Sequence, residues 1–347
     1  MPDHRPLRRL LLGALIALPA LAALPGRAPA AGAGEVNVYS TRQPELIRPI
    51  LDAFTRETGI RVNVAFISKG IVERLKAEGA RSPADVILTV DIARLKAVVD
   101  AGVTRPVRSE AIEAAVPARW RDPAGHWFGL TTRARAVYAS RERVADGEVT
   151  TYEDLADPRW KGRICTRSGL HPYNVALVAA MIYHHGEEAT RRWLEGLKAN
   201  LARRPQGNDR AQVKAIWAGE CDISLGNTYY MGKMLEREDQ RPWAEAVRIL
   251  FPRFENGGTH VNLSGMAMTA SAPHPEAALK LMEFLVSEEA QRLYAELNYE
   301  YPVRAGVPLS PVVASWGSFT PDDAPLATIA ELRPRALRLI EAVDFDG

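Results

Sequence analysis

"WFGLTTRARAVYAS", residues 127–140, is a long extended stretch with no helix between its two halves. The sequence before it alternates between strand and helix, and a second alternating block follows it. A strand that crosses from one lobe of a protein to another has this character. The stretch therefore divides the chain into two blocks and predicts that they are joined through one shared strand.

The block before the crossing has the pattern of a parallel sheet covered by helices. Short β-branched strands alternate with segments whose apolar residues recur at helical spacing. The order βαβαβα implies parallel strands with right-handed crossovers. The predicted strands are 35–40, 61–67 and 84–90, and the predicted helices are 44–59, 71–79 and 91–102.

The block after the crossing repeats this alternation, and a second extended stretch at 259–270 returns the chain. Its strand-like pieces are 163–168 and 221–227, and its helices are 173–186, 187–200, 209–219 and 229–238. Two lobes joined by two crossings make a hinged α/β clamshell, in which a ligand sits between the lobes at the carboxyl ends of strands. The predicted lobes are 31–132 plus about 261–305, and 133–260 plus about 306–347.

The amino terminus has the pattern of a secretory signal. Basic residues at 5–9 precede an apolar run at 10–24 and an Ala-Pro-Ala site at 28–30. This apolar run is shorter than the roughly 20 residues that a membrane-spanning helix needs. Removing residues 1–30 removes four arginines and one aspartate, which takes the formal net charge from +2 to −1 and excludes a nucleic-acid role. We expect a monomeric periplasmic protein that is not integral to the membrane, exported by the Sec or the twin-arginine route.

Two cysteines accompany two tyrosines at equal distances. Cys165 precedes Tyr173 by eight residues, and Cys221 precedes Tyr229 by eight residues. If the two strands are parallel neighbours in register, the cysteines meet at one end and the tyrosines at the other. An oxidising compartment permits a disulfide there. The alternative is a pair of buried free thiols.

Three segments share the design of strand, short polar turn and helix start. They carry Arg42 and Gln43, then Tyr173, then the adjacent pair Tyr229 and Tyr230. Helix N-termini stabilise anions, including an ionised phenol. A phenol has a pKa of about 10, so a hard, highly charged cation is needed to remove its proton. Three phenolates suit Fe³⁺, and the planar guanidinium of Arg42 suits an accessory anion.

The stretches at 38–63, 82–95 and 221–235 resemble the periplasmic ferric-ion-binding proteins of ABC importers, the bacterial transferrins. This resemblance covers nearly the whole chain after the signal and implies the type II binding-protein clamshell, with mixed sheets and helices on both faces. It implies that Tyr229 and Tyr230 are iron ligands. A third tyrosine, used by some branches, matches Tyr173.

The first loop departs from other branches of that family, because Gln43 and Pro44 stand where some members supply a histidine. Val90 stands where another branch uses a glutamate. The three-tyrosine branch, completed by a carbonate-type anion, resembles the chain better. The resemblance then implies Arg42 and Gln43 as anion contacts, with Arg133 and Asn227 as supporting residues behind the ligands.

The favoured function is binding of Fe³⁺ and its delivery to an inner-membrane ABC permease, without enzymatic turnover. One alternative is the same fold holding a phosphonate or sulfonate, with the tyrosines as hydrogen-bond donors. A second alternative is a secreted hydrolase, which needs a nucleophile and base that the sequence does not display. The identity of the accessory anion and the preference for Fe³⁺ over Fe²⁺ stay open.

Overall fold

Strands and helices alternate through residues 34–347, which with Met1 are the residues that this computed structural model describes. The predicted signal peptide at 1–30 lies, Met1 aside, outside the described residues. The strands are β1 (Glu35–Ser40), β2 (Arg61–Phe66), β3 (Val86–Thr89), β4 (Thr104–Arg105), β5 (Phe128–Ser140), β6 (Ile164–Cys165), β7 (Ile223–Asn227), β8 (Val247–Leu250), β9 (Val261–Thr269) and β10 (Tyr301–Pro302). The α-helices are α1 (Pro44–Thr58), α2 (Ile71–Glu78), α3 (Ile92–Asp100), α4 (Glu110–Ala115), α5 (Pro172–Ala199), α6 (Asp209–Trp217), α7 (Tyr229–Leu235), α8 (Arg241–Glu245), α9 (Pro275–Leu285), α10 (Glu288–Asn298), α11 (Pro311–Ala314), α12 (Leu326–Glu331) and α13 (Arg333–Ala342).

The predicted βαβαβα block is confirmed. β1 pairs in parallel with both β2 and β3, so the sheet begins in the order β2-β1-β3. Pro44 occupies the first turn of α1, where a missing N–H costs nothing. Gly59 ends that helix with φ 72°, a left-handed conformation that glycine adopts without a Cβ penalty.

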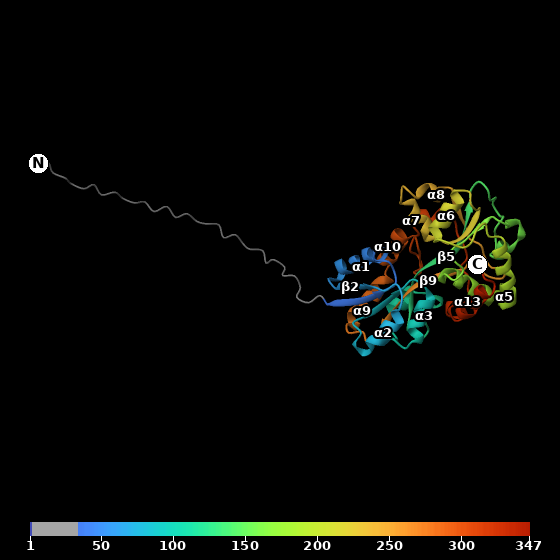
Figure 1. The fold of residues 1–347 in the computed structure, drawn as a ribbon. Helices are drawn as coiled ribbons and strands as arrows, with labels where there is room; N and C mark the ends of the chain where they lie inside the picture. Colours follow the sequence, from blue (N-terminus) through green and yellow to red (C-terminus); the bar gives the residue numbers. More distant parts are fainter. Residues whose placement is uncertain (2–33) are drawn as a thin grey trace. The chain divides into compact units, whose positions relative to one another are not determined.

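The crossing strand is confirmed as β5, whose 13 residues are all buried. Its first half pairs antiparallel with β9, and its second half pairs antiparallel with β7 and β8. One strand thus belongs to both sheets, and the strand path runs β2-β1-β3-β9-β5-β7-β6. Figure 1 shows β5 and its neighbour β9 in the middle of the fold. The predicted return stretch is β9, which brings the chain back to pair with β3.

The buried apolar residues form separate clusters on either side of this crossing. One cluster draws on residues 36–130 and 261–303, with Leu326 added. Two others draw on residues 136–254, and one of these also includes 324–345. The lobe boundaries given above stay a prediction. No helix in the described part of the chain has both the length and the apolar character to cross a membrane.

The two predicted helices at 173–186 and 187–200 run on as α5. The helical backbone is interrupted at Gly186, which has φ 76° and ψ 171°. A glycine tolerates this conformation because it has no Cβ. The two predicted helices are therefore two helical segments with a break between them.

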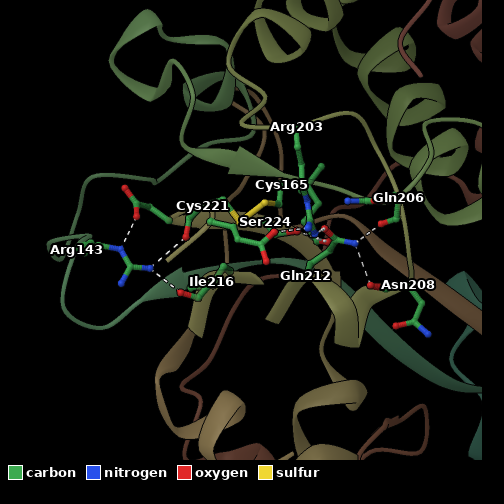
Figure 2. The surroundings of a disulfide bond; sticks show 12 residues. Arg143, Cys165, Arg203, Gln206, Asn208, Gln212, Ile216, Cys221 and Ser224 are labelled. Carbon is green, nitrogen blue, oxygen red and sulfur yellow. Dashed lines mark hydrogen bonds and ion pairs between the residues drawn. A yellow bond between two sulfur atoms is a disulfide. The ribbon is translucent and has the colours of Figure 1, made fainter. Parts of the chain in front are cut away.

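Cys165 and Cys221 form a disulfide with a Cα–Cα distance of 5.8 Å (Figure 2). The predicted parallel pairing of their segments is confirmed, but the predicted register is wrong, because Cys165 lies opposite Ser224. Cys221 lies before β7 begins, so its side chain reaches the partner from outside the strand. Arg143 fixes the same segment by donating to the carbonyl oxygens of Cys221, at 3.1 Å, and Ile216, at 2.6 Å.

We expect titration of denatured, unreduced protein to find no free thiol, because both cysteines of the chain are in this bond. The bond closes a loop across 56 positions, for which the chain-entropy model gives about 4 kcal/mol of stabilisation as an upper figure. Titration after reduction is the control and should find both thiols. Two titratable thiols in unreduced protein from an oxidising compartment would contradict the structure.

Candidate metal centre

A cavity of about 680 Å³ gathers the predicted site residues from distant parts of the chain. One wall is the loop between β1 and α1, and the other comes from the starts of α5, α6 and α7. Arg133 of β5 also lines it. The lining residues used below are Arg42, Gln43, Arg133, Tyr173, Arg210, Tyr229, Tyr230, Lys233, Glu236 and Glu300.

The tyrosine pair begins α7. Tyr229 is the first residue of the helix and Tyr230 the second, directly after β7 ends at Asn227. Thr228 precedes them without a side-chain capping bond. The two rings lie 4.3 Å apart between centroids and both are half-buried, and that of Tyr230 packs against a buried apolar cluster. Both residues thus lie in the first turn of α7, whose backbone N–H groups have no partner within the helix.

Tyr173 reaches the same point from the start of α5. Pro172 is the first residue of that helix, and the Nδ1 atom of His171 accepts a hydrogen bond from the backbone N–H of Tyr173 at 3.2 Å. The phenol oxygens of Tyr173 and Tyr229 lie 3.2 Å apart. Two tyrosines that are 56 positions apart in sequence, each in the first turn of a helix, therefore present their phenols to each other.

The phenols of Tyr229 and Tyr230 hold their protons tightly in the absence of a cation. Burial raises the pKa of Tyr229 well above its usual range, and the neighbouring phenols of Tyr173 and Tyr230 add to the effect. Burial, followed by Tyr173 and Asp209, raises the pKa of Tyr230 to about 12. A neutral cluster of phenols thus becomes anionic only when a strong positive charge replaces the protons.

A buried layer of ionic groups lies behind Tyr173. Both oxygens of the Asp209 carboxylate are bound, one by Arg135 at 2.8 Å and the other by Arg167 at 2.9 Å. The guanidinium carbons of these arginines lie 5.9 Å and 5.4 Å from the centroid of the Tyr173 ring. Although burial acts to raise it, these two arginines hold the pKa of Asp209 below its usual range. The guanidinium groups of this layer therefore lie against the ring of Tyr173.

Arg42 faces the tyrosines from the other wall, but it is not free. Its Nη2 atom donates to Glu300 Oε1 at 3.0 Å and to Ser264 Oγ at 2.5 Å. The prediction assumed a guanidinium available to an anion; the structure instead gives it a buried carboxylate partner. Gln43 is exposed at the start of α1 and makes no capping hydrogen bond with its side chain.

Both predicted supporting residues are buried, but only Arg133 lines the cavity. Arg133 donates to Ser264 Oγ at 3.1 Å and to the carbonyl of Val90, and its guanidinium carbon lies 6.0 Å from the centroid of the Tyr173 ring. Asn227 lies beneath the pair, where its side-chain oxygen accepts a hydrogen bond from Arg135 at 3.2 Å. Both residues thus lie within the polar groups that surround the tyrosines.

The sequence analysis missed Glu300, Ser264 and Asp209. Each is buried and contacts an arginine from a remote part of the chain, so no local spacing could have indicated it. Among the described residues, no group of three or more His, Cys, Asp or Glu could hold a metal ion.

The family model for bacterial extracellular solute-binding proteins matches residues 81–321. The chain belongs to this family. It is 50% identical over 295 residues to "Iron uptake protein A1" of Synechocystis, covering 84% of this chain and 82% of the relative. It is 52% identical to the apo ferric ion-binding protein A of Pasteurella haemolytica, with a TM-score of 0.86, covering 90% of this chain and 98% of that structure.

A third relative is a Trichodesmium protein solved in complex with iron and citrate ligands. It is 40% identical, with a TM-score of 0.85 over 90% of this chain and all of that one. The predicted resemblance to ferric-binding proteins is confirmed by these relatives, and so is the two-lobed α/β fold. A relative named for 2-aminoethylphosphonate binding, from Salmonella typhi, matches at only 24% identity.

Proposed function

We propose that this protein binds ferric iron outside the cytoplasm and delivers it to an ABC permease. The observation that carries the proposal is the meeting of Tyr173 and Tyr229, 3.2 Å apart at their oxygens, beside Tyr230 in one cleft. The iron is cargo, so the family's transport role requires no enzymatic turnover. Relatives named for ferric iron binding support the same cargo.

Each part of the site has a role in this account. Tyr173, Tyr229 and Tyr230 supply three phenolates, whose charges balance Fe³⁺ and whose hard oxygens suit it. The starts of α5 and α7 stabilise those phenolates through their backbone dipoles. Binding releases the phenol protons, so acid returns the site to its metal-free form. Competition between protons and iron for the phenol oxygens would therefore control loading and release.

The remaining coordination positions go to an accessory oxyanion of the carbonate type, held from the other wall by Arg42 and Gln43. Arg42 already pairs with Glu300 through Nη2, so the anion must approach the rest of its guanidinium. The Trichodesmium relative was solved in complex with both iron and citrate, so a carboxylate compound accompanies iron in that structure. The resemblance to the three-tyrosine branch implies the same ligand set.

The first rival is an organic anion, such as a phosphonate or sulfonate, bound by the same groups as hydrogen-bond donors. Ferric tyrosinate absorbs visible light, whereas an organic-anion complex is colourless. Purified protein should therefore be titrated with ferric nitrilotriacetate and, separately, with 2-aminoethylphosphonate. A visible band with one iron per chain supports the proposal. Protection against thermal unfolding by the phosphonate, without a visible band on addition of iron, supports the rival.

The accessory anion gives a prediction for Arg42. We expect Arg42→Ala to weaken iron retention, most strongly at low bicarbonate, because the anion loses its fixed cation. The variant should also lower the free energy of unfolding, because the buried carboxylate of Glu300 loses its partner. Arg42→Lys should restore only part of the retention, since an ammonium cannot make two parallel hydrogen bonds. The measurement is visible absorbance after iron loading in bicarbonate-free and bicarbonate-replete buffer.

Arg108→Ala is the matched control, because this arginine lies outside the cleft and is exposed. It should behave as the wild type in both buffers. If iron loading of the wild type is the same with and without bicarbonate or any substitute oxyanion, then side chains or water complete the coordination shell of the iron. The anion role of Arg42 is then wrong, even with the tyrosines right.

Cellular context follows from the same account. A secreted, monomeric binding protein would carry iron through the periplasm to an inner-membrane permease. The extracellular solute-binding family supports this place in the cell. The remaining rival, a secreted hydrolase, requires turnover of ester or phosphate substrates by purified protein.

A further inference from the structure

Tyr299 has a backbone conformation that its residue type rarely adopts. It follows α10 with φ 56° and ψ 33°, the left-handed position where glycine or asparagine is usual. Among the described residues, Asp344 is the only other non-glycine with positive φ. A tyrosine at such a position implies that its side chain makes contacts that a glycine could not supply.

Those contacts lie on α7, the helix that carries the tyrosine pair. The ring of Tyr299 covers Gly232 so closely that a Cβ at position 232 would lie 2.2 Å from it. Its hydroxyl donates to Glu236 Oε1 at 2.9 Å, and the Lys233 ammonium lies 5.5 Å from the ring centroid. Glycine is costly inside a helix, and here its missing side chain leaves the space that the ring occupies.

The next residue, Glu300, is bound to the opposite wall. Its Oε1 atom accepts the hydrogen bond from Arg42, and its Oε2 atom accepts one from Thr131 Oγ1 of β5 at 2.8 Å. Glu300 is only 3% exposed and both of its oxygens are used, so it has little freedom to move. Two consecutive residues thus contact the tyrosine helix and the anion-facing arginine.

We propose that Tyr299 and Glu300 are positioning residues that set the spacing between the tyrosine pair on α7 and Arg42 on the facing wall. In this proposal neither side chain is a ligand of the iron or of the anion. Because they are covalent neighbours, a shift of α7 at Gly232 is transmitted through Tyr299 to Glu300 and so to Arg42. This inference rests on the proposed function, since it concerns how the tyrosine and anion halves of one iron site are held together.

The test is the bicarbonate concentration needed for half-maximal iron retention against a competing chelator. Tyr299→Gly removes the ring but suits the left-handed backbone, and we expect it to raise that concentration at least about fivefold. Gly232→Ala should act in the same direction by filling the space beneath the ring. Tyr183→Ala is the control, because Tyr183 is exposed and lies outside the cleft, and it should match the wild type.

A combined variant separates positioning from a general loss of stability. If Tyr299 acts through Arg42, Tyr299→Gly should have no further effect on bicarbonate dependence in the Arg42→Ala background. An undiminished further effect there would overturn the proposal, as would wild-type bicarbonate dependence in both Tyr299→Gly and Gly232→Ala. The proposal would also be overturned if iron retention by the wild type did not depend on bicarbonate concentration. Failure of the wild type to bind iron at all would instead overturn the proposed function.

Discussion

Protein carrying both Tyr229→Phe and Tyr230→Phe should show no visible absorption band after incubation with ferric nitrilotriacetate. Phenylalanine keeps the ring and its packing at the start of α7 but deletes the oxygen that would bind iron. Each single substitution should already lower iron affinity by at least about 100-fold, the upper end of what losing a supporting partner of a metal ligand costs. Tyr173→Phe should weaken or shift the band. The measurement is absorbance with parallel iron analysis.

Tyr183→Phe is the matched control, because it removes a phenol from an exposed position of α5 outside the cleft. Its iron content and colour should equal those of the wild type. The assignment of the ligands would be wrong if the double variant bound iron with unchanged colour. Loss of colour with an unchanged circular dichroism spectrum would tie the effect to the site.

Asp209→Asn should lower the free energy of unfolding by about 3–5 kcal/mol, the cost of breaking a buried ion pair. The carboxylate is fully buried between Arg135 and Arg167, and an amide cannot neutralise either guanidinium. Urea unfolding at neutral pH measures the loss. Asp100→Asn is the control: Asp100 pairs with Lys96 at the surface, and its loss should cost less than about 1 kcal/mol.

The same pair predicts a dependence on pH. The pKa of Asp209 is lowered in the folded protein, because its two arginines outweigh the effect of burial. Its contribution to stability is therefore complete above the unfolded pKa of about 4 and is lost as pH falls through the lower folded value. Asp209→Asn should thus lose less stability on acidification than the wild type does. Equal stability of variant and wild type at neutral pH would contradict the burial of a charged pair.

The elements that the sequence predicted are those determined by local chemistry. Periodic apolar residues, Pro44 at a helix start and Gly59 at a helix end are properties of short segments, and α1 has these bounds. The crossing strand was predictable because residues 128–140 contain no helix signal. The position of the tyrosine pair in the wall of the cavity was predictable, because adjacent residues at a helix start can both face a cleft.

What the sequence could not predict depends on contacts between distant residues. Arg42 and Glu300 are separated by 258 positions, so neither residue's surroundings indicated the other. The register of the cysteine strands failed for a related reason. Equal eight-residue spacing suggested equal geometry, but Tyr173 follows a loop and a helix start, whereas Tyr229 follows its strand almost directly. Counting residues does not measure distance when the intervening backbone differs.

Anomalous X-ray diffraction from crystals of iron-loaded protein tests the central claim most directly, because it locates the metal itself. We predict one iron peak per chain, within coordination distance of the phenol oxygens of Tyr173, Tyr229 and Tyr230. An iron peak that none of these three oxygens contacts, or iron-loaded crystals with no peak in the cleft, would contradict the account.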